Sequence, residues 1–186
     1  MNNIINVTDL DDSIIAENDN LILGTSTWGA GEMQDDWYDG IKMLKSANLE
    51  GKTVALFGCG DSESYPDTFV GGMAELYNVV KNVGACVIGG VSTNGYTFDE
   101  SVSVVDGKFV GLALDEVNED DKTDERINAW VAEIQPSLYP IHLSLLSSYH
   151  AAVHNTTRRY EGSDEPYIRI QKGGAPYGAI HLQQKI

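Results

Sequence analysis

Short apolar runs alternate with segments of helical spacing, and this alternation constrains the fold more than any other feature of the chain. The apolar runs are residues 21–24, 53–58, 85–88 and 109–114. Between and after them, apolar residues recur at helical intervals in residues 37–44, 69–80 and 127–134. Continuous apolar strands separated by amphipathic helices are typical of a parallel sheet covered on both faces. We therefore expect an α/β fold in which ligands bind beyond the carboxyl ends of the strands.

The last of these helices has the clearest boundaries. Thr123 is expected to be its N-cap, and the acidic residues that follow favour the positive end of a helix. Pro136 is expected to end it, because proline lacks the N–H that a helix interior needs.

Charge divides the chain near residue 138. The net charge is −16, yet residues 1–138 carry 25 Asp and Glu against 7 Lys and Arg, whereas residues 139–186 carry 3 and 5. We interpret residues 1–138 as one acidic domain and residues 139–186 as a C-terminal extension of unknown role. The acidic balance argues against a nucleic-acid partner, which needs a basic footprint, and favours docking on basic partner surfaces.

The remaining composition predicts a reduced, cytoplasmic protein. Cys59 and Cys86 are too few for a disulfide framework. No apolar run is long enough to span a bilayer, and the first residues lack the pattern of a secretory signal, so no membrane association is expected. All four histidines lie after residue 138, where their spacing is only a weak metal signal, so we expect no metal site.

Two loops that follow strands are the candidate ligand site. They are residues 25–34 and 58–67, and each contains one aromatic residue, Trp28 or Tyr65, among small and polar residues. Two aromatics on neighbouring loops are suited to sandwiching a planar heterocycle, while loop amides satisfy its polar edge. The alternative is that both aromatics merely cap the end of the sheet, and their spacing alone does not decide between these interpretations.

The residues of both loops resemble the flavodoxin family. Residues 27–37 match its Thr-Trp-x-x-Gly-Glu-x-Gln-x-Asp-Trp pattern, and residues 58–69 match its Gly-x-Gly-Asp-x-x-x-Tyr-x-x-x-Phe pattern. Residues 94–112 are similar to the insertion that splits the last strand in long-chain members. The resemblance spans residues 4–138 and implies a flavodoxin-like, doubly wound parallel sheet with strand order 2-1-3-4-5.

The resemblance implies FMN as cofactor and low-potential one-electron transfer, rather than substrate turnover, as function. Trp28 and Tyr65 would flank the isoalloxazine ring. The Gly29–Ala30 peptide would lie where family members reorient a carbonyl towards the flavin, a role that suits glycine because it readily adopts positive φ. The cofactor-binding residues implied in this way are Ser26, Thr27, Trp28, Gly29, Ala30, Gly31, Cys59, Gly60, Asp61, Tyr65 and Asp67.

Acidic residues around this site imply both its potential and its partners. Residues such as Glu32, Asp61 and Asp67 would repel a negatively charged reduced flavin and make it a low-potential donor. The alternative for the same residues is a solvated face. The implied partners are basic redox proteins, namely reductases or oxidoreductases that accept low-potential electrons.

The chain departs from the family at its N-terminus. The family's first strand and its phosphate-binding loop are missing or replaced, and residues 4–10 resemble the second strand instead. Residues 166–170 as a strand, 171–178 as a glycine-rich loop and 179–182 as a helix start are one possible substitute. The other is an extension that packs loosely, pairs at an edge or stays mobile. A flavodoxin-derived, acidic binding module without FMN, or a rearranged product without function, are therefore alternatives to the electron carrier.

Overall fold

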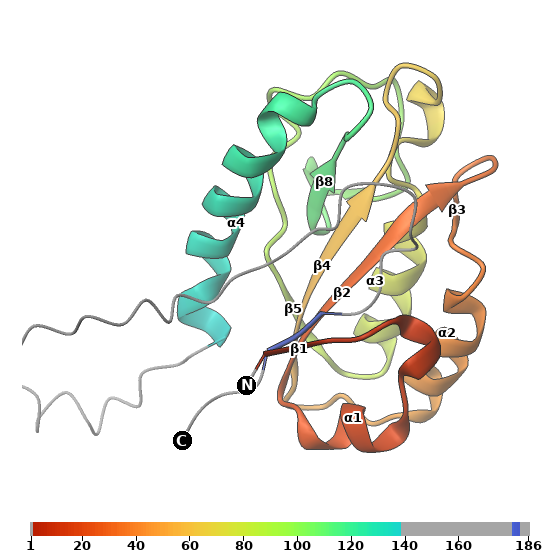
Figure 1. Cartoon of the computed structure of the whole chain (residues 1–186), viewed down its shortest axis with the longest axis vertical. Coiled ribbons are helices and arrows are strands. Elements are labelled where there is room, and N and C mark those ends of the chain that lie inside the picture. The colour runs from red at the N-terminus through yellow and green to blue at the C-terminus, as the bar shows by residue number, and fades with distance from the viewer. Residues whose placement is uncertain (1, 139–179, 183–186) are drawn as a thin grey trace, which may run out of the picture.

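A seven-stranded sheet lies at the centre of the molecule. The computed structural model describes residues 2–138 and 180–182 (Figure 1). Along its main path the strand order is β1-β9-β2-β4-β5, with β3 paired to β2 and β8 paired to β4. The strands are β1 (Asn2–Ile4), β2 (Asn20–Trp28), β3 (Glu32–Met33), β4 (Thr53–Cys59), β5 (Cys86–Ile88), β8 (Leu112–Leu114) and β9 (Ile180–Leu182), and a separate hairpin consists of β6 (Val104–Val105) and β7 (Lys108–Phe109).

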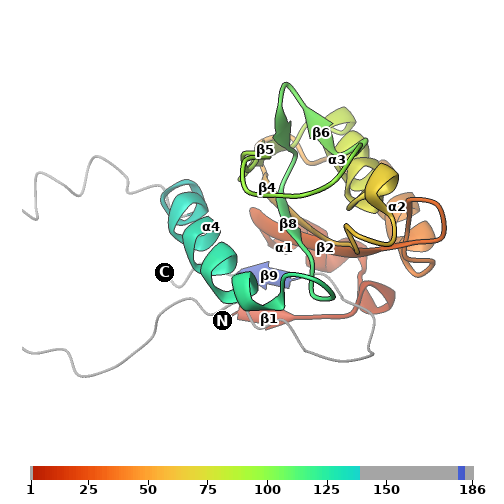
Figure 2. The ribbon, with the colours of Figure 1, turned by 90° about the horizontal axis from the view of Figure 1, so that it is seen from above.

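Helices cover both faces of this sheet. The α-helices are α1 (Asp12–Glu17), α2 (Trp37–Ser46), α3 (Gly72–Asn82) and α4 (Thr123–Leu138), and short 3-10 turns are η1 (Val7–Asp9), η2 (Pro66–Thr68) and η3 (Asp120–Lys122). Helices α2 and α3 lie on one face and α4 lies on the other, and α1 lies at the end of the sheet where β2 begins (Figures 1 and 2). Strand β4 pairs in parallel with β2, with β5 and with β8. The predicted doubly wound α/β fold is confirmed.

Alternate residues of the central strands feed two separate cores. Leu23 of β2 and Leu56 of β4 belong to the larger core, under α2 and α3. Ile22 and Phe57 point the other way, into the smaller core with Trp130 of α4. This two-faced burial explains why both strands read as continuous apolar runs.

The strand predicted over residues 109–114 is instead divided. Phe109 belongs to the β6–β7 hairpin, and only residues 112–114 join the sheet as β8. Strand β5 pairs with the first half of β4 and β8 with the second half, so residues 89–111 interrupt one strand position. Gly111 makes the re-entry possible, because a Cβ at this position would lie 2.2 Å from the carbonyl oxygen of Leu56.

The two ends of the chain meet in the sheet. β9 lies between β1 and β2 and is antiparallel to both, with His181 opposite Asn3 on one side and Leu21 on the other. The predicted helix start at residues 179–182 is therefore wrong for residues 180–182, because neighbouring strand edges impose extended pairing on a segment too short to fix its own conformation. Residues 166–178, predicted as a strand and a loop, lie outside the described residues.

Helix α4 differs from its prediction at both ends. Thr123 is its first helical residue rather than its N-cap, and its hydroxyl donates a hydrogen bond to the Glu116 carboxylate. Pro136 lies inside the helix, which continues to Leu138. A proline this close to the C-terminus removes one backbone hydrogen bond, whereas Ile134 and Leu138 both remain buried in the smaller core. None of the helices in the described part of the chain has the length and apolarity required to cross a membrane.

Candidate functional site

A cavity of about 550 Å³ lies at the carboxyl ends of β2, β4 and β8. Eight of the predicted cofactor-binding residues line it, namely Ser26, Thr27, Trp28 and Gly29 from the first loop and Cys59, Gly60, Asp61 and Tyr65 from the second. Ala30, Gly31 and Asp67 are not among the lining residues. The structure thus brings together both loops that the sequence singled out, at the end of the sheet where a parallel α/β fold is expected to bind ligands.

The first loop is a tight hairpin rather than a simple strand-to-helix connection. β2 continues to Trp28 and pairs with β3, and the Gly31 N–H donates to the Trp28 carbonyl at 3.0 Å. Gly29 has a φ of +52° and Gly31 a φ of +111°, both in the region that side chains disfavour. The Ala30 N–H donates to the Glu32 carboxylate at 2.6 Å, which holds the tip in place.

The first loop also packs against the second. A Cβ at Gly31 would lie 3.1 Å from the Cβ of Thr68, so glycine permits this close approach. Gly31 and Ala30 therefore shape the hairpin without lining the cavity. Asp67 lies in η2 with an exposed side chain and is not among the lining residues.

The second loop is organised by the Asp61 side chain. Its Oδ1 accepts hydrogen bonds from the Ser64 N–H at 2.9 Å and from the Asn118 side-chain amide at 2.9 Å. These bonds hold the pKa of Asp61 below its ordinary value. The Tyr65 N–H donates to the Asp61 carbonyl at 3.1 Å, so the same residue positions Tyr65 at the cavity.

Trp28 and Tyr65 are only half-buried, although both line the cavity. Their exposed fractions are 48% and 56%. Trp37, only nine residues after Trp28, is fully buried and donates its indole N–H to the Gly24 carbonyl at 2.9 Å. Aromatics that merely capped the sheet would lie against its core as Trp37 does, so the exposure of Trp28 and Tyr65 favours a ligand-facing role.

A third loop completes the lining, and the sequence analysis did not include it in the site. Glu116 and Val117 follow β8 and face the cavity, as do Thr68, Phe69 and Val70 from the end of the second loop. The sequence does contain a signal for this loop. Residues 115–118 follow a strand of the same parallel sheet, so they are expected at the same edge as the other two loops.

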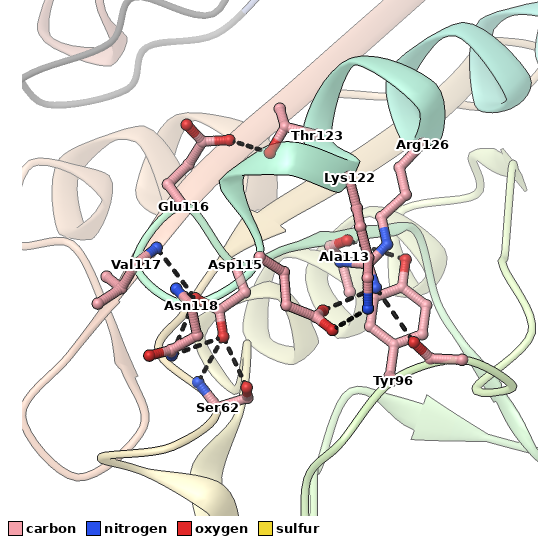
Figure 3. Close-up of polar contacts among 12 residues, drawn as sticks. Ser62, Tyr96, Ala113, Asp115, Glu116, Val117, Asn118, Lys122, Thr123 and Arg126 are labelled. Carbon is pink, nitrogen blue, oxygen red and sulfur yellow. Dashed lines mark hydrogen bonds and ion pairs between the residues drawn. The ribbon is translucent and has the colours of Figure 1, made fainter.

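Asp115 anchors this third loop (Figure 3). Its side chain is fully buried and accepts bonds from the Ser62 hydroxyl at 2.6 Å and the Ser62 N–H at 2.9 Å. The N–H groups of Val117 and Asn118 donate to its other oxygen at 3.0 and 2.9 Å. Burial by itself raises the pKa of Asp115, but these hydrogen bonds outweigh it and lower the pKa overall, so the carboxylate is ionised at neutral pH.

Cys59 contributes a neutral thiol to the lining. Burial, and then the negative charges of Glu116 and Asp115, raise its pKa to about 12. It is therefore unsuited to act as a nucleophile at neutral pH.

The chemistry of the lining suits a flat, polar ring. Small residues and backbone amides surround two aromatic faces, and the charged side chains of the lining are the acidic Asp61 and Glu116. Across the described residues, no three or more His, Cys, Asp or Glu side chains are grouped to hold a metal ion.

Comparison with known proteins points to one family. The model of the flavodoxin family matches residues 2–130. The chain is 46% identical over 134 residues to flavodoxin 1 of Azotobacter vinelandii, covering 71% of this chain and 76% of that protein. It is 40% identical over 134 residues to a Picosynechococcus flavodoxin, covering 72% and 79%. Among solved structures, Fusobacterium nucleatum flavodoxin bound to flavin mononucleotide is similar, with a TM-score of 0.68, 38% identity and coverage of 72% and 79%.

Proposed function

Because this chain belongs to the flavodoxin family, we propose that it is an FMN-dependent, low-potential one-electron carrier and not an enzyme that turns over a substrate. The observation that carries this proposal is the cavity at the carboxyl edge of the sheet, where Trp28 and Tyr65 stand half-exposed on different loops. Bound FMN would supply the ability to take up and release single electrons.

The described residues fit the ring of this cofactor. Trp28 and Tyr65 would stack on the isoalloxazine, and the backbone at Thr27, Cys59 and Asp61 would satisfy its polar edge. Gly29 has a positive φ, which a residue with a side chain adopts only with strain, so glycine suits the Gly29–Ala30 peptide at the hairpin tip. Ser26 and Gly60 complete the contact surface, whereas Ala30, Gly31 and Asp67 would act by shaping the loops.

The charge around the cavity supports a low potential. Asp61 and Glu116 line it, and the low pKa of Asp61 keeps that carboxylate ionised at neutral pH. A negative charge at short range raises the energy of a ring that gains an electron, so electron donation becomes more favourable. Trp28, Tyr65 and Val117 are exposed at the cavity, so a ring held between them would be accessible to a partner protein.

We further propose that the partners are redox proteins with basic docking surfaces. Residues 1–138 carry an excess of acidic over basic residues, which favours such surfaces by long-range attraction. The interruption of one strand position by residues 89–111 supports assignment to the long-chain type. The place of β9 between β1 and β2 supports the view that it substitutes for the family's first strand.

Flavin titration tests the proposed function. The purified full-length chain, stripped of bound flavin, is titrated into FMN while flavin fluorescence is followed. Quenching that saturates at micromolar protein is expected, because stacking on Trp28 and Tyr65 quenches the excited ring. A cooperatively folded protein that produces no quenching would instead indicate an acidic binding module without FMN. A protein that neither quenches nor unfolds cooperatively would indicate a product without function.

A further inference from the structure

One side-chain amide joins two carboxylates beside the cavity. The Nδ2 atom of Asn118 lies 2.9 Å from Oδ1 of Asp61 and 2.9 Å from Oδ2 of Asp115. Asp61 belongs to the loop after β4 and Asp115 to the loop after β8, so this amide spans two of the three loops that line the cavity. Figure 3 shows its contact with Asp115.

Each carboxylate fixes the loop from which it comes. The Asp61 carboxylate accepts a hydrogen bond from the Ser64 N–H, and the Asp61 backbone carbonyl accepts one from the Tyr65 N–H. Asp115 binds the N–H groups of Val117 and Asn118. The Asn118 amide is therefore placed to transmit the position of one loop to the other.

We propose that Asn118 is a positioning residue that clasps the Tyr65 loop to the 115–118 loop and so sets the width of the flavin-ring site. This inference rests on the proposed function, because the ring is the ligand whose faces the loops would contact. Asn118 is not among the residues that line the cavity, so its effect on binding is transmitted through Asp61 and Asp115.

An amide is the group that this place requires. Both carboxylates are held ionised, since hydrogen bonds lower the pKa of Asp61 and of Asp115. Two carboxylates that lie within hydrogen-bond distance of the same nitrogen repel each other unless a donor lies between them. Asn118 supplies two N–H donors on one nitrogen without adding a charge of its own.

The experiment compares substitutions at Asn118 with matched substitutions at Asn128, an exposed residue of α4 that does not line the cavity. Riboflavin is the probe, because it has the ring but no phosphate and so reports on the ring site alone. Its dissociation constant is measured by fluorescence quenching for the apo-protein and its variants.

Asn118→Ala is expected to bind riboflavin about tenfold more weakly, the loss typical of one charge-assisted hydrogen bond. Asn118→Asp should bind more weakly still, although it keeps the size of the side chain, because it replaces the donors with a third negative charge. A residue that acted only by filling space would give the opposite order. Asn128→Ala and Asn128→Asp should leave riboflavin binding unchanged.

A pH profile supplies the second measurement. In Asn118→Asp the new carboxyl faces Asp61 and Asp115, with Glu116 and Glu119 nearby in sequence, so its pKa should be raised. Lowering the pH from 8 towards 5.5 protonates it and restores one donor. Riboflavin binding by this variant should therefore improve relative to the wild-type chain at the same pH.

The outcomes separate this inference from the proposed function. Equal riboflavin binding by wild type, Asn118→Ala and Asn118→Asp would overturn the clasp while leaving the flavin carrier intact. A wild-type chain that quenches neither riboflavin nor FMN would overturn the proposed function itself. Should Asn118→Asp fail to fold, as judged by circular dichroism, Asn118→Ala against Asn128→Ala still decides the inference.

Discussion

Exposure distinguishes aromatic residues that have similar surroundings in the sequence. Trp28 and Trp37 lie nine residues apart, yet Trp28 is 48% exposed at the cavity and Trp37 is fully buried under the sheet. The positions of Trp28 and Tyr65 after strands made both residues candidates, and the resemblance to the flavodoxin family implied that they are ligand neighbours. The prediction did not include Glu116 and Val117, because it rested on the two loops that each contain an aromatic residue and the loop after β8 contains none.

Replacing Trp28 should weaken flavin binding more than replacing an equally exposed aromatic elsewhere. Trp28→Ala is expected to raise the dissociation constant for FMN about tenfold, because it removes one stacking face and its buried area. Tyr38→Ala is the matched control, since Tyr38 is 50% exposed on α2 and does not line the cavity. Equal effects of the two changes in a fluorescence titration would contradict the assignment of Trp28.

The two cysteines should differ in reactivity. Cys86 is exposed, whereas Cys59 is buried and its pKa is raised to about 12. Treating the native protein with iodoacetamide at pH 8 should therefore label Cys86 and spare Cys59, as read by peptide mass spectrometry.

The raised pKa of Cys59 also implies a loss of stability at alkaline pH. In the unfolded chain the thiol has its ordinary pKa of 9.0, whereas in the folded chain its pKa is about 12. Between pH 9 and about 12 the thiol ionises only when the chain unfolds, so the free energy of unfolding falls as the pH rises through this range.

Elements whose own sequence determines their conformation were predicted well. β2, β4, α2 and α3 were predicted near their observed positions, because long apolar runs and helical stripes reflect burial directly. Elements that depend on distant contacts were not. The run at residues 109–114 is apolar throughout, yet Phe109 stays in the insertion, where it packs against Phe69 and Tyr96 and does not join the sheet. Likewise, Pro136 would end an isolated helix, but the burial of Leu138 extends α4 beyond it.

The re-entry of the chain beside β4 should tolerate no side chain at Gly111. Gly111→Ala is expected to destabilise the protein by roughly 1–3 kcal/mol, because the new Cβ would meet the Leu56 carbonyl at 2.2 Å and force the backbone apart. Urea unfolding followed by tryptophan fluorescence measures the change. Val102→Ala in the same insertion is the control, since Val102 is 73% exposed and should alter stability little. An unchanged midpoint for Gly111→Ala would contradict the close approach.

At the scale of the whole molecule, the sheet is assembled from both ends of the chain. The motifs at residues 27–37 and 58–69 predicted the architecture and the location of the site, because each follows a strand of the parallel sheet and so lies at the same edge. They did not predict β9. Three residues far from their partners carry no periodicity, and only the edges of β1 and β2 determine that they are extended. The domain division at residue 138 stays a prediction.

The pairing of β9 should contribute measurably to stability. His181→Pro removes the N–H from the middle of this strand and should lower the free energy of unfolding by roughly 1–3 kcal/mol. His181→Ala keeps the N–H and is the control for the side chain. If the two variants unfold at the same urea concentration, the pairing of β9 with β1 and β2 contributes nothing to the folded state.

The antiparallel place of β9 also sets the order in which the molecule can be completed during its synthesis. In the described sheet β1 is an edge strand joined to the rest through β9, which is made about 176 residues later. At roughly 5–20 residues per second, the ribosome needs on the order of 10–40 s between the two. Throughout that interval the edges of β1 and β2 await their partner, and exposed strand edges are the places where chains pair wrongly. The nascent protein is therefore open to wrong strand pairing until residues 180–182 have left the ribosome and paired with β1 and β2.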